Sequence, residues 1–301
     1  MYYQIKNLLK RVFDRVGFLK PVKFLLRPIH RYYKNLNQYR YKNKRVIVTR
    51  DGIKYELELN EMIDNTIFYE GKFEPQTTKA LQSLCKPNMV VLDVGANIGC
   101  HTLRMARIVG PTGKVVAFEP TTWAFEKLKR NCDLNHLNNV VLEKLALSDE
   151  RSLKDVRMYN RWPVQPTIGM AGKLHPIHRG YGEMETVEFL TLDEYVMSKR
   201  YGHVDLIKVD VDGYEAKFIR GAKKVMKTLR PILVMELCPY TLREVGDDIA
   251  DLLKSILGLE YDIFYEYDLE DSADPKCISQ ELLETDKSIN AVLRPCKKPT
   301  G

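Results

Sequence analysis

No apolar run in this 301-residue chain approaches the roughly 20 residues that a helix needs to cross a bilayer. The first residues also lack the gathered apolar core of a signal peptide, because apolar and charged side chains are interleaved there. The six cysteines contain no C-x-x-C pair, which argues against a structural zinc site and for reduced thiols. We therefore expect a cytoplasmic protein without a membrane-spanning segment.

Acidic residues are scarce at the N-terminal end of the chain. Asp14 is the one acid before residue 46, beside thirteen Lys and Arg, whereas the rest of the chain carries 34 basic and 39 acidic side chains. So sharp a change in charge predicts a boundary, with a basic extension over 1–45 and a globular domain over 46–301. The second part is long enough to bury one full-sized core.

The extension contains an amphipathic pattern of helical period. Its apolar members are Ile5, Leu8, Leu9, Val12, Phe13, Val16 and Leu19, and Lys6, Lys10, Arg11 and Arg15 fall on the opposite side of the helical wheel. This segment could pack on its own domain, lie on an anionic membrane surface or bind nucleic acid. We favour the membrane over residues 1–20, as a peripheral contact at the inner face, and consider nucleic acid the weakest of the three.

Two apolar runs in the first half of the globular part enclose a glycine-containing loop. The first run, VVLDV, leads through Asp93 into Gly95, Asn97 and Gly99, and the second, KVVAF, ends at Glu119. A buried parallel strand, a tight turn, a helix and a strand that ends in a carboxylate form the arrangement by which α/β sheets bind a ribose. Glu119 is therefore predicted to bind both ribose hydroxyls of an adenosine.

Two cofactors share this arrangement, NAD and S-adenosylmethionine (SAM). A dinucleotide site favours G-x-G-x-x-G, whose glycines let a pyrophosphate approach the helix N-terminus. Here Asn97 stands where the second glycine would be, and Asp93 before the loop suits an ammonium group. SAM carries that ammonium and no phosphate, so SAM is the predicted cofactor.

The alternation of strands and helices continues to the C-terminal end. The spacing predicts a helix over 121–136, strands at 140–145, 204–209 and 231–236, helices near 214–228 and 245–257, and an antiparallel pair from YDIFYEY and INAVLRP. Ser148 and Asp149 follow the strand at 140–145, where an acidic side chain could accept the adenine amino group. Both residue types also cap helices or turns.

Three carboxylates lie where two neighbouring strands end. Asp210 and Asp212 follow the strand at 204–209, and Glu236 ends the next strand. Because ligands of open α/β sheets bind at the carboxyl ends of the strands, these acids could serve as general base or hold a divalent cation. Asp210 is the favoured catalytic residue. Asp212 could instead cap the helix that begins near Tyr214.

Taken together, these motifs resemble the FkbM-type family of SAM-dependent methyltransferases. The segments DVGANIG, AFEP, ALSD, KVDVDGYE, RPILVMEL and NAVLRP occur in the family's order between about residues 46 and 295. The resemblance implies a Rossmann-like class I methyltransferase fold, with a seven-stranded, mostly parallel sheet and a terminal antiparallel hairpin, and methyl transfer to a hydroxyl oxygen. Saccharides and natural products are frequent acceptors of the family. The chain departs from the family at Asp212, where Glu is common.

The resemblance also implies roles outside the strand tips. In such enzymes a residue in the region of Glu74 often covers the methionine end of SAM, although Glu74 could equally be a surface acid before Pro75. Residues 151–190 are long for a connection and are interpreted as an insertion that binds the acceptor. His175 or His178 in this insertion could act as general base.

The predicted function is therefore O-methylation of a glycan, glycolipid or related hydroxylated small molecule. The alternative is an RNA or protein methyltransferase that docks its substrate through the basic extension. The chain lacks the [DNS]-P-P-[YFW] tetrapeptide of enzymes that methylate exocyclic base amines, and it reads VDVDGYE at that point. A degenerate fold used as a tether is disfavoured by the intact loop and carboxylates.

The membrane interpretation of the extension predicts a simple binding result. Deletion of residues 1–20 should release the protein from liposomes that contain anionic lipid, because each basic residue contributes up to ~1 kcal/mol near a charged leaflet. Co-sedimentation of the full chain and the deletion variant with neutral and anionic liposomes measures this. Equal binding of both proteins to anionic liposomes would contradict it.

Overall fold

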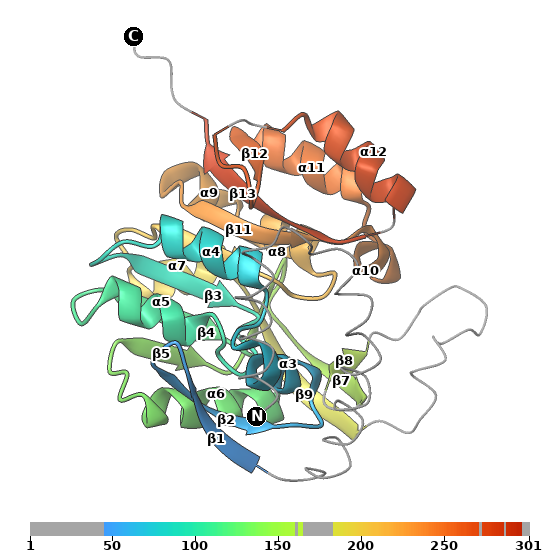
Figure 1. Ribbon diagram of the computed structural model, residues 1–301. Coiled ribbons are helices and arrows are strands. Elements are labelled where there is room, and N and C mark those ends of the chain that lie inside the picture. Colours follow the sequence, from blue (N-terminus) through green and yellow to red (C-terminus); the bar gives the residue numbers. More distant parts are fainter. Residues whose placement is uncertain (1–44, 160–161, 165–182, 271–272, 286, 297–301) are drawn as a thin grey trace, which may run out of the picture. The chain divides into compact units, whose positions relative to one another are not determined.

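The computed structural model describes residues 45–159, 162–164, 183–270, 273–285 and 287–296. The chain forms two compact units, one that extends to Pro75 and one from Gln76 to Gly301. Figure 1 labels their helices and strands. The extension over 1–45, with its predicted membrane contact at 1–20, lies almost wholly outside the described residues. The division at residue 75 also places residues 46–75 outside the larger unit.

The described part of the first unit is a strand pair followed by a helix. Strands β1 (Arg45–Arg50) and β2 (Ile53–Glu58) pair antiparallel, and helix α3 (Met62–Glu70) follows. The two-residue turn between the strands, Asp51 and Gly52, has positive φ at both positions, as tight hairpins require. The Glu58 backbone N–H donates to Asp64 Oδ2 at 2.5 Å, which ties the end of β2 to α3.

The second unit contains the predicted seven-stranded sheet. Its strands run in the order β12-β13-β11-β10-β3-β4-β5. Six of them run in one direction, and β13 is antiparallel to both of its neighbours, so the predicted sheet with its antiparallel terminal pair is confirmed. The bounds are β3 (Val90–Val94), β4 (Lys114–Phe118), β5 (Val140–Glu143), β10 (Leu206–Val209), β11 (Ile232–Leu237), β12 (Tyr261–Tyr265) and β13 (Ile289–Pro295).

Helices cover both faces of this sheet, as a buried parallel sheet requires. On one face, residues such as Val91 and Val234 pack against α4 (Pro75–Leu84) and α5 (Thr102–Val109). On the other, residues such as Leu92 and Leu233 pack with α7 (Leu192–Lys199), α8 (Glu215–Gly221), α9 (Lys223–Thr228), α11 (Ile249–Gly258) and α12 (Pro275–Thr285). Helix α6 (Thr122–Leu134) contacts β5, and α10 (Pro239–Glu244) follows β11.

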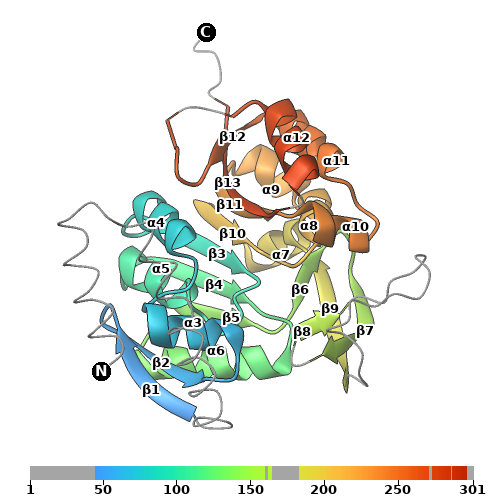
Figure 2. The ribbon, with the colours of Figure 1, turned by 45° about the vertical axis from the view of Figure 1, so that its right-hand side comes forward.

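A second, four-stranded sheet occupies most of the described part of the insertion (Figure 2). It consists of β6 (Ala146–Ser148), β9 (Glu183–Thr191), β7 (Ser152–Tyr159) and β8 (Trp162–Val164), in that order. The insertion at 151–190, expected from its length to be a loop, is corrected at its described ends, which form strands. SLKDVRMY and EMETVEFLT pair antiparallel, and charged residues alternate with apolar ones along much of each strand. Its binding of the acceptor stays a prediction.

The remaining predicted elements differ from the structure in detail. The helix expected over 214–228 is divided into α8 and α9 at Ala222. Gly221 packs so closely on the end of β6 that a Cβ would lie 1.9 Å from the Ser148 carbonyl oxygen. Helix α12 separates the two antiparallel strands β12 and β13, which are therefore not a tight hairpin.

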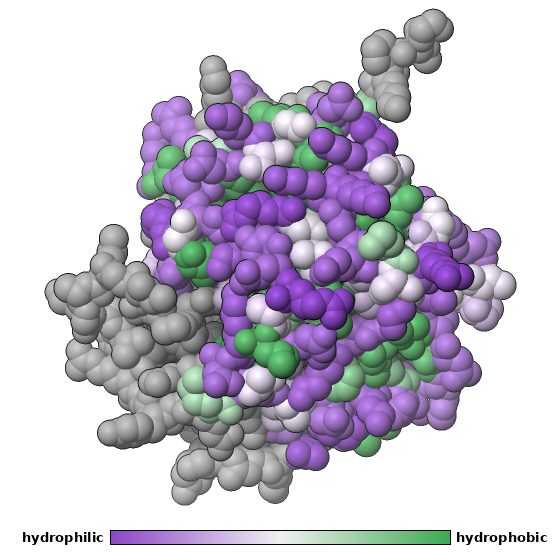
Figure 3. Space-filling model, turned by 180° about the vertical axis from the view of Figure 1, so that it is seen from behind, coloured by the Kyte–Doolittle hydropathy of each residue, from purple (hydrophilic) through white to green (hydrophobic). Residues whose placement is uncertain are grey.

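The surface of the described chain is mostly hydrophilic. Figure 3 shows one face, on which hydrophobic residues form small, scattered patches among hydrophilic ones. Within the residues that the structure describes, no helix combines the length and the hydrophobicity that a membrane span requires.

Candidate functional site

The loop after β3 lies against the end of β10, and glycine makes this approach possible. Gly95 has φ +77°, and a Cβ there would be 1.8 Å from the Asp210 carbonyl oxygen. The Asp210 backbone N–H in turn donates to the Val94 carbonyl oxygen at 3.1 Å. Any larger residue at position 95 would push the loop away from Asp210. The loop expected to hold a cofactor and the aspartate expected to perform catalysis are therefore direct neighbours.

Five successive N–H groups of this loop donate to the protein itself. Those of Gly95 and Ala96 both reach the Phe118 carbonyl oxygen, and that of Gly99 reaches Ala96. The Asn97 N–H donates to Glu119 Oε2 at 2.9 Å, and the Ile98 N–H donates to the Asn97 side chain at 2.8 Å. A pyrophosphate site needs such groups directed at the ligand. The internal bonding of the loop disfavours a dinucleotide.

Glu119 lies at the end of β4, where the sequence placed it. Its carboxylate is 5% exposed and accepts three hydrogen bonds, from Asn97 N–H and from the N–H and hydroxyl of Thr121. Burial raises the pKa of Glu119, although these hydrogen bonds and the charge of Lys208 oppose the rise. Each carboxylate oxygen accepts up to two hydrogen bonds, so the carboxylate of Glu119 can accept one more, for example from a ribose hydroxyl. Its role toward the ribose stays a prediction.

Asp93, predicted to bind the ammonium of SAM, already has an ammonium of the protein nearby. It is fully buried, its Oδ2 accepts from the Thr102 hydroxyl at 2.5 Å, and its Oδ1 lies 3.9 Å from Lys208 Nζ. Oδ1 has no hydrogen-bond partner among the described residues. Asp93 therefore fixes the start of α5 and shares the charge of Lys208, and contact with a cofactor ammonium remains a prediction.

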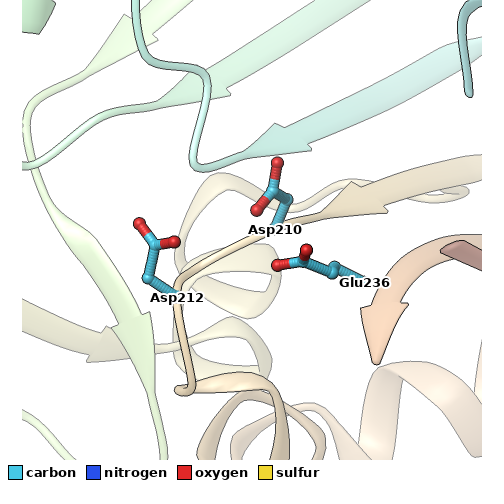
Figure 4. Close-up of side chains that lie close together, drawn as sticks. All are labelled: Asp210, Asp212 and Glu236. Atoms are coloured by element: carbon cyan, nitrogen blue, oxygen red, sulfur yellow. The ribbon is translucent and has the colours of Figure 1, made fainter. Parts of the chain in front are cut away.

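The three strand-tip carboxylates converge as the sequence predicted. One oxygen of each of Asp210, Asp212 and Glu236 lies within 4.8 Å of the others. Figure 4 shows Asp210 at the end of β10, Asp212 in the loop that follows, and Glu236 pointing from β11 toward both. Asp212 has φ +48° and is exposed, whereas Asp210 and Glu236 are half-buried. Position 214, not 212, is the N-cap of α8.

The convergence of these charges has a large electrostatic consequence for Glu236. Burial, followed by the charges of Asp210, Glu215 and Asp212, raises its pKa to about 9. Glu236 therefore carries a proton at neutral pH.

Glu215 is a fourth carboxylate beside the trio. It is fully buried, and its Oε1 accepts from the N–H groups of Val211 and Gly213, which holds the loop that carries Asp212. Its Oε2 is buried without a hydrogen-bond partner among the described residues. Burial raises its pKa to about 7, with Asp210 and Asp212 adding to the rise.

A chain of polar side chains continues beyond Glu236 along the sheet edge. Asn290 on β13 is the register partner of Glu236. Its amide donates to the Thr77 hydroxyl at 3.1 Å, and Thr77 donates to Glu266 at 2.8 Å. These groups extend the polar surface of the site past the carboxylates.

Ser148 and Asp149, the predicted adenine contacts, belong to the end of β6. Ser148 is 1% exposed, and Asp149 accepts from Arg220 Nε at 2.9 Å. Arg220 also donates to both oxygens of Asp247. Burial by itself would raise the pKa of Asp149. The hydrogen bond and the positive charge of Arg220 have the larger effect, so the pKa of Asp149 is lowered. Asp149 is thus an ionised acceptor, and its contact with adenine stays a prediction.

The structure does not place two of the predicted site residues relative to this group. His178 and its neighbour His175 lie outside the described residues. Glu74 belongs to the first unit, where it has φ +42°. Their proposed roles toward base catalysis and the cofactor stay predictions.

Lys208, Glu215 and Arg220 are site residues that the sequence interpretation did not assign. Lys208 is 4% exposed although it is a lysine, and Glu215 is fully buried although it is a glutamate. The signal for Lys208 is present in the sequence, since it interrupts an otherwise apolar strand, LIKV. A charge inside a buried strand needs a partner, and the strand-tip aspartates were the nearest candidates.

A protein-family comparison matches the described site. The family model for the methyltransferase FkbM domain matches residues 93–263, from the cofactor loop to β12. With this match, the sheet order confirms the predicted class I SAM-dependent methyltransferase fold.

Curated relatives carry methyltransferase names. Methyltransferase 1 of Beauveria bassiana is 29% identical over 49% of this chain and 64% of that protein. Hexuronic acid methyltransferase AglP of Haloferax volcanii is 27% identical over 54% of the chain and 61% of that protein. The 2-O-methyltransferase NoeI of Sinorhizobium fredii is 25% identical over 54% and 71%. The chain therefore spans less than two thirds of the first two relatives.

Among solved structures, an FkbM methyltransferase from Methylobacillus flagellatus aligns with a TM-score of 0.42 and 17% identity, covering 69% of this chain and 43% of that one.

The raised pKa of Glu236 predicts how stability depends on pH. Between its ordinary value of 4.5 and about 9, the folded protein holds a proton that the unfolded chain has lost, so rising pH costs stability. Glu236→Gln removes this cost. The melting temperature of the variant minus that of the wild type should therefore increase from pH 5 to pH 9. The expected increase is about 2–4 °C for each kcal/mol of destabilisation that the substitution removes.

Thermal unfolding in EDTA-containing buffers at several pH values measures this difference. Glu244→Gln, an exposed carboxylate of α10, is the matched control and should show no such trend. A Glu236→Gln difference that does not change with pH would contradict the prediction.

Proposed function

Because the chain belongs to the FkbM methyltransferase family, we propose that it transfers the methyl group of SAM to a hydroxyl oxygen of a saccharide or related hydroxylated small molecule. The observation that carries the proposal is the convergence of Asp210, Asp212 and Glu236 beside the cofactor loop. Two relatives bear names that point to such acceptors, a hexuronic acid methyltransferase and a 2-O-methyltransferase.

The chemistry asks little of the protein beyond position and proton removal. The acceptor oxygen forms a bond to the methyl carbon, the carbon–sulfur bond breaks, and sulfur retains its electron pair. The hydroxyl proton must leave as the new bond forms, and a positioned carboxylate accelerates this by about 10²–10⁴-fold. We assign this role to Asp210. Lys208 holds its Oδ2 at 3.0 Å, and its Oδ1 accepts no hydrogen bond from the described residues.

The other carboxylates have distinct parts in this proposal. Asp212 is exposed and lies next to the proposed position of the acceptor. Glu236, protonated at neutral pH, can donate a hydrogen bond to a second acceptor oxygen. Toward SAM we assign one ribose hydroxyl to Glu119, whose carboxylate can accept one further hydrogen bond, and the adenine amino group to Asp149, with the loop from Gly95 to Gly99 beneath them. If His178 instead removes the proton, Asp210 becomes a charge partner of the acceptor.

The same trio has the donor set that a hard divalent cation prefers, oxygen atoms of carboxylates. The buried Oε2 of Glu215 adds an unpartnered oxygen among the described residues nearby. A cation there would lower the pKa of the acceptor hydroxyl, so it is an alternative to base catalysis for the same step. Base catalysis is favoured because Lys208 already neutralises part of the charge on Asp210.

Asp210→Asn should separate catalysis from cofactor binding. The amide retains the shape of the side chain but cannot take a proton, so turnover should fall by about 10²–10⁴-fold while affinity for SAM stays within about threefold. Glu119→Ala should instead abolish SAM binding. Transfer of label from methyl-labelled SAM into a fractionated lysate, with calorimetry for binding, measures both.

The fraction that takes up the label decides the acceptor class. Label in glycan or lipid-extractable material supports the proposal. Label in nuclease-sensitive or protein material would overturn it in favour of an RNA or protein substrate. Full turnover by Asp210→Asn would move the catalytic role to another residue.

Chelation distinguishes the two roles of the carboxylates. After exhaustive treatment with EDTA, turnover should persist, because Asp210 accepts the proton without a metal. Loss of turnover that Mg²⁺ or Mn²⁺ restores, with no metal response in Glu236→Gln, would assign the trio to a cation instead.

A further inference from the structure

Lys208 is a buried charge that none of the assignments above uses in catalysis or binding. It lies on β10, two residues before Asp210, and is 4% exposed. Its ammonium contacts three parts of the site: Asp210 Oδ2 at 3.0 Å, the Gly95 carbonyl oxygen at 3.3 Å and Asp93 Oδ1 at 3.9 Å. Burial of an ammonium costs several kcal/mol unless such partners surround it.

Each of the three partners belongs to a different function of the site. Gly95 is in the loop proposed to bind the cofactor, Asp93 connects that loop to α5 through Thr102, and Asp210 is the proposed proton acceptor. The backbone joins the same parts, since Gly95 lies against the Asp210 carbonyl group. Lys208 adds a side-chain connection with a charge, so the orientation of Asp210 and the path of the loop depend on one ammonium group.

We propose that Lys208 is a positioning residue that couples the cofactor loop to Asp210. Its ammonium holds the loop carbonyl and the catalytic carboxylate in one arrangement, so that a bound SAM methyl group and the proton acceptor are presented together. The proposal rests on the proposed function, because it takes Asp210 as the residue that receives the acceptor proton.

The ratio of the affinities for SAM and its product depends on the charge of Lys208 and not on its packing. SAM carries one more positive charge than its product S-adenosylhomocysteine (SAH), at the sulfur atom, which the proposed function places beside the three carboxylates. A neighbouring ammonium weakens binding of the sulfonium relative to the thioether. Removing the ammonium therefore shifts the ratio of the two affinities, whereas a simple loss of packing weakens both ligands equally.

Calorimetric binding of SAM and SAH to the full chain at pH 8 tests this. Lys208→Met should weaken SAH about tenfold but SAM only about threefold, so the preference for SAM rises about threefold. Lys208→Arg keeps the charge and should keep the wild-type ratio. Lys154→Met, which removes a lysine paired with Glu150 at 2.8 Å in the second sheet, is the control and should leave both affinities unchanged.

A second experiment tests the coupling by substitution of Asp210, the partner of Lys208. Asp210 is only half-buried, so Asp210→Asn should disturb the fold less than a substitution at buried Lys208. It therefore serves as a second variant if Lys208→Met folds poorly. If Lys208 couples Asp210 to the loop, Asp210→Asn should weaken SAH by about two- to threefold when Lys208 is present and should have no effect on SAH in the Lys208→Met background. Additive losses, or a Lys208→Met protein whose SAM and SAH affinities both stay within about twofold of wild type, would overturn the proposal.

This experiment needs no acceptor, so its failure differs from failure of the proposed function. A wild-type protein that does not bind SAM contradicts the proposed function. A wild-type protein that binds SAM, with an unchanged ratio in Lys208→Met, contradicts only the role of Lys208.

Discussion

The close approach of the Gly95 loop to the end of β10 is the constraint on which the rest of the site depends. A Cβ at Gly95 would lie 1.8 Å from the Asp210 carbonyl oxygen, so the loop reaches this position only with glycine. That approach places Asp93, Asp210 and Lys208 around one point. It also directs the loop N–H groups toward the end of β4, where the Phe118 carbonyl group and Glu119 accept them. The two sides of the site, which we propose to bind the cofactor and the acceptor, both depend on this backbone contact.

Around that contact, charge is distributed unevenly. On the cofactor side, each carboxylate has a partner: Glu119 has Asn97 and Thr121, Asp93 has Thr102, and Asp149 has Arg220. On the acceptor side, four carboxylates lie together, and burial with mutual repulsion raises the pKa of Glu236 to about 9. Clusters of carboxylates with raised pKa values are costly to stability and concentrate at functional sites. This imbalance favours chemistry on the acceptor side and binding on the other.

Much of the sheet was predictable because parallel strands buried on both faces read as continuous apolar runs. VVLDV, KVVAF and ILVMEL each became a strand with the predicted bounds to within two residues, and the acids at their ends met at one edge. The second sheet was not predicted, because its strands alternate charged and apolar residues and are separated by a Pro- and Gly-rich stretch. Lys208 and Glu215 were missed for another reason. Lys208 contacts Asp210 two residues away, but also Asp93 and the Gly95 carbonyl group, which are distant in sequence. Glu215 accepts from backbone N–H groups, and the periodicity of a single strand or helix does not reveal such contacts.

We propose that SAM lies over the Gly95 loop with its methyl group directed at Asp210, Asp212 and Glu236. A crystal structure of the complex with SAH tests this most directly. We expect the sulfur atom of SAH to face these three carboxylates and a ribose hydroxyl to contact Glu119. A ligand whose sulfur points away from the trio, or whose ribose does not contact Glu119, would contradict the claim.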